Sequence, residues 1–250
     1  MCKAFSGIID QVGKVTWKLG VDSHSDLARF GGYKDEVLGE FAKFEITPKN
    51  NDYLNPDEWV YRVDESPVPK WCGAHEKELA LAAHKKWLKQ LNKFLVRKPI
   101  VHPFEVAPPT ELKRKHTLLL KKWDSVRDSV GDSVGGSVWV SVGGSVWVSV
   151  GDSVWDSVGD SVRDSVGDSV GDSVWDSVRD SVWAYTGSFF RIPVWKYVKH
   201  PKGKYPYQPL VTLWNSGLVP SFDGTTWRLH GGKKAAVLFS ITKTELEKYK

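Results

Sequence analysis

Hydrophobic residues recur with two different spacings along this chain. From Ser125 to Val182 every fourth residue is Ser, and each Ser is followed by Val, in fifteen units without an insertion. The position after Val varies between Trp, Gly and Arg, and the last position of the unit is usually Asp. On both sides of this tract, apolar residues recur at the spacings of ordinary strands and helices. The pattern predicts a repeat module between two non-repetitive parts.

The part before the repeat, residues 1–122, predicts a small α+β domain. Its expected elements are a hairpin turning at residues 10–13, a short helix within residues 22–32, strands over residues 41–48 and 58–65, and a lysine-rich amphipathic helix over residues 75–96. Residues 110–123 form either a short helix or the first strand of the repeat. In the part after the repeat, residues 184–250, a short helix ends at Gly217, and strands turn at Asp223 and at Gly231.

The repeat itself, residues 123–183, is ambiguous between helix and strand. A four-residue period drifts by about 40° per unit against a 3.6-residue turn, and Ser, Val, Asp and Gly all have low helix propensity. Disorder is disfavoured by the regular Val and the six Trp. These considerations predict a β-solenoid with Val inside, Ser and the variable residue outside, and Asp or Gly at the corners. Val140 and Val148 do not suit corner positions.

The predicted fold class is therefore mixed α/β and all-β. A short tetrapeptide β-solenoid lies between an N-terminal α+β domain and a C-terminal cap. Recurrence of the variable residue favours a four-sided coil of 16 residues over a three-sided one. The cap is expected because an uncovered last strand would recruit another chain.

Charge divides along the same boundaries. The net charge is +5, yet residues 124–183 hold eleven Asp and three Arg, which leaves +13 for the rest of the chain. The regularly spaced Asp residues of the repeat could form Asx-type turns at the corners. As the alternative, their charges could imitate the phosphates of a nucleic acid backbone. Two cysteines do not form a disulfide framework, and neither a signal peptide nor an apolar run of membrane-spanning length is found. We expect a cytoplasmic protein, in the host cytoplasm if it is phage-encoded, without a membrane partner.

Three stretches resemble uncharacterised proteins of phage and environmental origin. They are MCKAFSGII with GKVTWKLGVDSHSD, DSVWDSVRDSVWAY, and YPYQPLVTLWNSGLVPSFDGTTWRLHGG. The resemblance implies a viral or microbial origin and a D-S-V-[WGR] repeat tract, and it transfers no activity.

Candidate binding residues come mainly from the variable position of the repeat. An outward aromatic and cationic face could stack on bases, sugars or a partner protein, and its expected members are Trp139, Trp147, Trp155, Arg163, Trp175 and Arg179. The alternative is that these side chains cover neighbouring coils or mediate self-association. Residues 199–209 interleave lysines with aromatics, which suits a nucleic acid or another anionic ligand if the segment is not simply a solvated surface.

Candidate catalytic residues are few. Cys2 would become an N-terminal nucleophile if Met1 were removed, and His24 lies between Asp22 and Asp26, which could form a His–Asp pair or ligate a metal. Helix capping explains the same residues, and we predict no metal and no cofactor. The leading expectation is a non-enzymatic, phage-associated protein that binds a nucleotide, a nucleic acid, or a host or phage protein. The alternatives are an enzyme using Cys2, His24 and Asp26, and a structural module that forms homo-oligomers.

Overall fold

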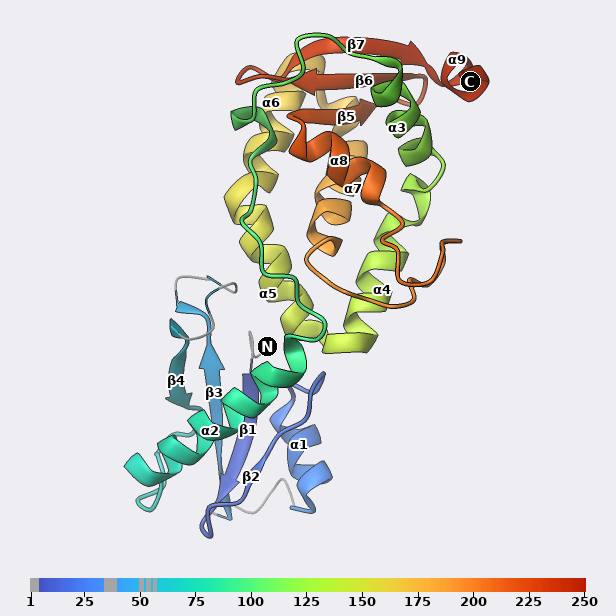
Figure 1. Ribbon diagram of the computed structural model, residues 1–250. Helices are drawn as coiled ribbons and strands as arrows, with labels where there is room; N and C mark the ends of the chain where they lie inside the picture. The colour runs from blue at the N-terminus through green and yellow to red at the C-terminus, as the bar shows by residue number, and fades with distance from the viewer. Residues whose placement is uncertain (1–4, 34–39, 50–51, 53–54, 56–57) are drawn as a thin grey trace. The chain divides into compact units, whose positions relative to one another are not determined.

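The structure, a computed structural model, describes residues 5–33, 40–49, 52, 55 and 58–250 (Figure 1). The chain divides into two compact units. The first comprises Met1–Leu95 and Val138–Ser153, and the second comprises Val96–Ser137 and Val154–Lys250. Within the described part of the chain, every helix is too short or too polar to cross a lipid bilayer.

The first unit contains an antiparallel sheet in the order β2-β1-β3-β4. Its strands are β1 (Phe5–Asp10), β2 (Val15–Thr16), β3 (Phe41–Thr47) and β4 (Val60–Val63). The predicted hairpin is confirmed: Gly13 has a φ of 82°, and the Asp10 side chain accepts hydrogen bonds from the backbone of Val12 and Lys14. The predicted strands over residues 41–48 and 58–65 are also confirmed.

Two helices cover opposite faces of this sheet, because side chains alternate along β1. Ile8 packs with Leu27 and Ala28 of α1 (His24–Gly31), whereas the ring of Phe5 lies 5.2 Å from that of Trp87 on α2 (Ala74–Leu91). Figure 1 shows α2 crossing in front of the sheet. Both helices were predicted from their capping residues and apolar spacing, and both are confirmed.

The second unit ends in a three-stranded antiparallel sheet. Its elements after residue 200 are α8 (Gln208–Asn215), β5 (Leu218–Phe222), β6 (Thr226–Gly231), β7 (Ala236–Thr242) and α9 (Lys243–Lys248). The predicted helix and both turns are confirmed. The short η3 (Pro103–Glu105) and then α3 (Arg114–Asp124) precede the repeat, and α3 and α8 pack together.

The repeat is helical, so the predicted β-solenoid, four-sided or three-sided, is wrong. Its elements are η4 (Arg127–Ser129), α4 (Val130–Val142), α5 (Gly144–Val154), the π-helical turn η5 (Trp155–Gly159), α6 (Asp160–Val170), η6 (Asp172–Val174) and α7 (Trp175–Gly187). Both sheets lie in the flanking sequence, neither is closed, and the chain is about half helical.

Buried valine explains why low helix propensity does not prevail. Thirteen of the fifteen repeat valines are at most 3% exposed, which confirms that Val points inward. Burying one Val stabilises the fold by about 1.5–2 kcal/mol. The propensity cost of a four-residue unit relative to Ala is roughly 2 kcal/mol. The two effects are therefore of equal size, so Val burial offsets the low helix propensity without distinguishing a helix from a strand, and the helix adds its internal hydrogen bonding.

Serine contributes to that hydrogen bonding. Ser129, Ser153 and Ser181 donate from Oγ to the carbonyl oxygens of residues 126, 149 and 177, over 2.7, 2.9 and 3.0 Å. A hydroxyl that bonds its own helix needs no other partner, so it can be buried beside Val.

The mismatch between a period of 4 and a turn of 3.6 residues is relieved by interruptions. Gly143 and Gly171 separate helices in the left-handed region, with φ of 94° and 84°. The turn Trp155–Gly159 is π-helical, and a π turn holds more residues than an α turn. The interruptions redirect the valine stripe and so limit the drift of Val toward the surface: only Val126 and Val170 of the fifteen repeat valines are not buried.

Val138 and Val140 provide a matched test of the stripe, because they lie on one helix and are 0% and 69% exposed. We expect Val138→Ala to lower the free energy of unfolding by about 1–3 kcal/mol through the cavity it leaves. Val140→Ala should change it by less than about 0.5 kcal/mol. Urea unfolding followed by circular dichroism measures both, and equal effects would contradict a helical repeat with one buried face.

Gly159 and Gly151 test the packing of the variable position. A Cβ at Gly159 would lie 2.7 Å from Trp155 Cδ2, whereas a Cβ at Gly151 meets no atom within 4 Å. We expect Gly151→Ala to raise the melting temperature, since Ala is favoured over Gly in a helix by about 1 kcal/mol. Gly159→Ala should lower it despite the same gain, by overpacking. A rise for both variants in a thermal melt would show that the Trp155 contact does not constrain the helix.

Candidate functional site

Three of the six residues predicted to bind a ligand lie in one chain of contacts. The Trp155 indole N–H donates to Asp160 Oδ1 over 2.8 Å, and Arg163 Nη2 lies 3.3 Å from the same oxygen. The Arg163 guanidinium also lies 5.3 Å from the ring centre of Trp175. The indole and the guanidinium are thus already partnered within the protein.

The other three predicted binding residues lie elsewhere. Trp139 on α4 is 56% exposed and Trp147 on α5 is half-buried, and both belong to the first unit. Arg179 on α7 forms an ion pair of 3.1 Å with Asp176. The structure therefore does not gather the six residues into one face, and their role in binding stays a prediction.

Two of the three candidate catalytic residues, His24 and Asp26, are placed by the structure, both on α1. Cys2 lies outside the described residues. Asp26 is exposed on α1, where it lies 3.5 Å from Arg29. His24 is the first residue of α1, and its Nδ1 lies 3.6 Å from Oδ2 of Asp64, a residue that the sequence analysis did not single out.

A cavity of about 710 Å³ in the second unit is the better candidate for a functional site. It lies among the connector after α2, the loop after α7 and helix α8. Its lining includes the cations Lys98, Arg191 and Lys204, the neutral polar residues Ser188, Gln208 and Asn215, and the apolar residues Phe190, Ile192, Trp195 and Val211. Among the described residues that line it, none is acidic. Its volume is typical of small-molecule sites.

The connector that carries Lys98 is anchored on both sides of that residue. The backbone N–H of Val96 donates to the carbonyl of Phe189 over 2.6 Å. The backbone N–H of Val101 donates to Tyr185 Oη over 2.8 Å, and its carbonyl accepts from the Trp214 indole over 2.8 Å. The start of the connector is thus bonded to α7, the loop after α7 and α8, which holds Lys98 at the cavity wall.

Lys98 is an ammonium group with only neutral neighbours. Its Nζ donates to Ser188 Oγ over 2.6 Å and lies 4.6 Å from the ring centre of Phe189. Among the described residues, no carboxylate forms an ion pair with it. Burial lowers the pKa of Lys98 to about 8, because a charge is less stable where less water surrounds it. A bound anion would relieve this cost.

A second part of the cavity lining is held by a tight turn and an aromatic pair. Gly203 has a φ of 74°, and its N–H donates to the carbonyl of Pro193 over 3.2 Å, which places Lys204 at the cavity. The Tyr205 ring packs edge-on against Trp195 at 4.9 Å, and its hydroxyl donates to the carbonyl of Ala184. Burial raises the Tyr205 pKa well above its usual value, so this hydroxyl is neutral at physiological pH.

Part of this cavity lies where the sequence suggested an anionic ligand. Lys204, Tyr205 and Gln208 belong to the basic and aromatic segment 199–209. Lys98 was missed, because its surroundings come from residues 90 positions further along the chain, such as Ser188. In the sequence, Lys98 is a lysine beside Pro99 at the start of a connector, a pattern too common to indicate a ligand site.

Comparison of the chain with protein-family models, with curated proteins and with solved structures finds no match.

The depressed pKa of Lys98 can be measured directly. We expect an NMR titration of the lysine side-chain nitrogens to show one resonance with a midpoint near 8, because that ammonium is desolvated. The resonance should be absent from Lys98→Met. A midpoint above 10 for the resonance assigned to Lys98 would show that water reaches the group freely.

Proposed function

We propose that this protein is a non-enzymatic binding protein for a small phosphorylated molecule with a flat ring, such as a nucleoside phosphate. The ligand would lie in the cavity beside Lys98. The observation that carries the proposal is the half-buried Lys98 ammonium, which faces a cavity without an acidic residue among its described lining.

Charge supports an anionic ligand. Lys98, Arg191 and Lys204 line one cavity whose described lining holds no acidic residue, which favours an anion over a cation as the ligand. A guanidinium can bind two phosphate oxygens at once, and a lysine acts as a point charge. A phosphate group would therefore gain charge-assisted hydrogen bonds and remove the desolvation cost of Lys98.

The remaining lining supports a ring attached to the phosphate. Phe190, Ile192, Trp195 and Val211 supply apolar surface next to the cations. Ligand sites commonly combine an apolar wall with a few placed polar groups. The amides of Gln208 and Asn215 carry both donors and acceptors, which suits the edge of a nucleobase.

The aromatic and cationic set of the repeat supports a partner protein less well. Trp155 and Arg163 both contact Asp160, and Arg163 lies over the Trp175 ring, so a partner would have to replace contacts that already exist. Binding of a host or phage protein, and self-association, stay predictions from the sequence.

Calorimetric titration with adenosine 5′-monophosphate tests the proposal, with Lys98→Met and Lys202→Met as matched variants. Lys202 is an exposed lysine of the same segment and does not line the cavity. Methionine keeps the length of the side chain, and replacing a desolvated charge by an apolar group preserves folding. We expect Lys98→Met to weaken binding about 10- to 100-fold, as for loss of a charged hydrogen bond, and Lys202→Met to leave it unchanged.

The ligand series separates the two parts of the proposal. Adenosine without its phosphate should bind far more weakly, and ribose 5-phosphate should bind less tightly than the nucleotide. Affinity should fall as pH rises through 8, since Lys98 then loses its proton. Equal affinity of wild type and Lys98→Met, or the absence of binding by every phosphorylated probe, would refute a phosphate site here.

A further inference from the structure

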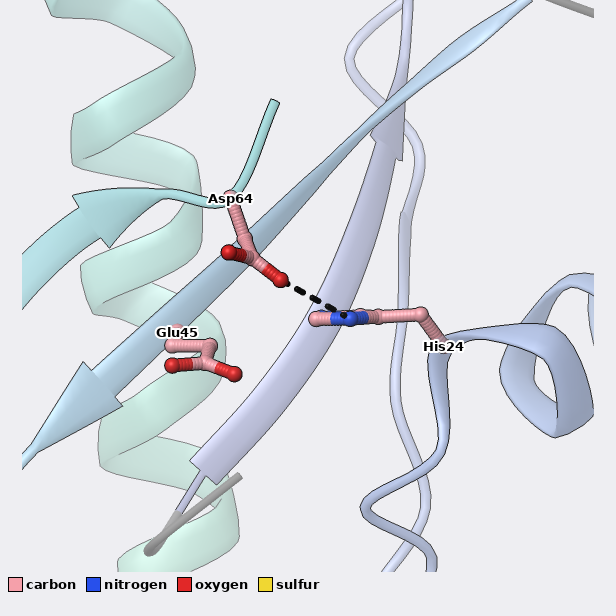
Figure 2. A group of neighbouring side chains, drawn as sticks. All are labelled: His24, Glu45 and Asp64. Atoms are coloured by element: carbon pink, nitrogen blue, oxygen red, sulfur yellow. Dashed lines mark ion pairs between the residues drawn. The ribbon is translucent and has the colours of Figure 1, made fainter. Parts of the chain in front are cut away.

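A cluster of ionisable side chains lies on one face of the sheet of the first unit, remote in sequence from the cavity residues. In the antiparallel register, Glu45 on β3 is opposite Ser6 on β1 and opposite Arg62 on β4. Opposite residues point to the same side, and Asp64, two residues after Arg62, shares that side. Strand alternation alone thus places two carboxylates together, as Figure 2 shows.

Helix α1 adds His24 to this face. Ser23 caps the helix by accepting from the backbone N–H of Asp26 over 3.2 Å, which fixes His24 at the first turn. The Nε2 of His24 lies 3.1 Å from the carbonyl oxygen of Phe44. A carbonyl only accepts, so Nε2 carries a proton, and Nδ1, the nitrogen that is left to bind an ion, lies 3.6 Å from Asp64 Oδ2.

Three lone-pair donors therefore converge. One ligand atom each of His24, Glu45 and Asp64 lies within 4.8 Å of the others. Glu45 is only 7% exposed, where an uncompensated carboxylate is costly. A cation among these atoms would offset the mutual repulsion of the two carboxylates.

The cation present in the structure is Arg62. Its Nη2 lies 3.3 Å from Glu45 Oε2 and 3.6 Å from Asp64 Oδ1, but the side chain is 69% exposed and can leave into solvent. A second observation points to a missing ligand. Ser6 Oγ is buried next to Glu45 and has no hydrogen-bond partner among the described residues, although buried hydroxyls normally have one.

We propose that His24 Nδ1 and one carboxylate oxygen each of Glu45 and Asp64 bind a divalent transition-metal ion, such as Zn²⁺ or Mn²⁺. Ligands of one such ion lie roughly 3 to 4 Å apart, so the three atoms need to move only slightly. Imidazole with two carboxylates is a donor set that these ions accept.

The surroundings of the three ligands fit this assignment. The carbonyl of Phe44 orients the imidazole through its other nitrogen, as is usual for a metal-bound histidine. Asp64 is 41% exposed, so ions can enter from solvent, and three protein ligands leave room for water. Ser6, beside Glu45, can hydrogen-bond such a water. The site is independent of the proposed phosphate site, since it shares no residue with the cavity.

Arg62 distinguishes this site from a purely structural ion-pair cluster. If the cluster is structural, Arg62→Gln leaves buried negative charge that no added ion relieves. If it is a metal site, Arg62 competes with the ion, and Arg62→Gln binds the ion more tightly. Removing Arg62 therefore has opposite consequences under the two interpretations.

The experiment is a titration of the full chain with ZnCl₂ by calorimetry and with MnCl₂ by electron paramagnetic resonance. We expect wild type to bind one ion at this site, Asp64→Asn to bind at least tenfold more weakly, and Arg62→Gln to bind several-fold more tightly. Asp26→Asn is the matched control, an exposed carboxylate on α1 outside the cluster, and should match wild type.

A second ligand variant, Glu45→Gln, and thermal melts with and without Zn²⁺ provide two further measurements of metal binding. Zn²⁺ should raise the melting temperature of Arg62→Gln more than that of wild type, because an ion that binds only the folded state stabilises it. The proposal is overturned if wild type binds no ion, or if Asp64→Asn and Glu45→Gln, shown to be folded by circular dichroism, bind as wild type does. It is also overturned if Zn²⁺ fails to raise the melting temperature of Arg62→Gln.

Discussion

Burial of one valine in every four residues is the constraint on which the repeat depends. Thirteen such valines are buried on helices whose turn does not match their spacing. The left-handed Gly143 and Gly171 and the π turn at Trp155–Gly159 follow from this mismatch, because an uninterrupted α-helix would rotate the stripe away from the core. Ser tolerates the resulting close packing, since its hydroxyl bonds a carbonyl of its own helix. Helix breaks in this protein are therefore a consequence of sequence period.

The flanking elements could be predicted because local signals and packing agree there. Ser23 and Gly32 mark both ends of α1, and alternation with turn residues marks the hairpins. In the repeat they disagree. Ser, Val, Asp and Gly disfavour helix by propensity, and a single inward residue in four suits a three-residue strand as well as a helical stripe. Val burial is common to both folds, so it was predicted correctly while the secondary structure was not.

The candidate sites, like the repeat, could be predicted from the sequence only in part. Residues 199–209 signalled an anionic ligand by composition, and four of the cavity residues lie there. Lys98 and Ser188 are 90 positions apart, and only the tertiary fold makes them neighbours. His24 was singled out with Asp22 and Asp26, its neighbours in sequence. Its contacts in the structure are with Asp64, directly after β4, and with the Phe44 carbonyl on β3. Glu45 and Asp64 share a face through alternation, but that signal in residues 41–48 and 58–65 can be used only once the strand register is known.

The variable position of the repeat acquires a physical meaning from the helices. In the second unit, Trp and Gly at this position face one another. A Cβ at Gly159 would lie 2.7 Å from the Trp155 ring, and a Cβ at Gly167 would approach the Trp175 indole to 3.1 Å, both closer than ordinary contact. A large ring at one unit thus requires an absent side chain at another. The repeat pattern alone predicts an outward position here, since the position tolerates Trp, Gly and Arg. In the helical structure that variation is coupled, because bulk at one position is accommodated by the lack of bulk at its partner.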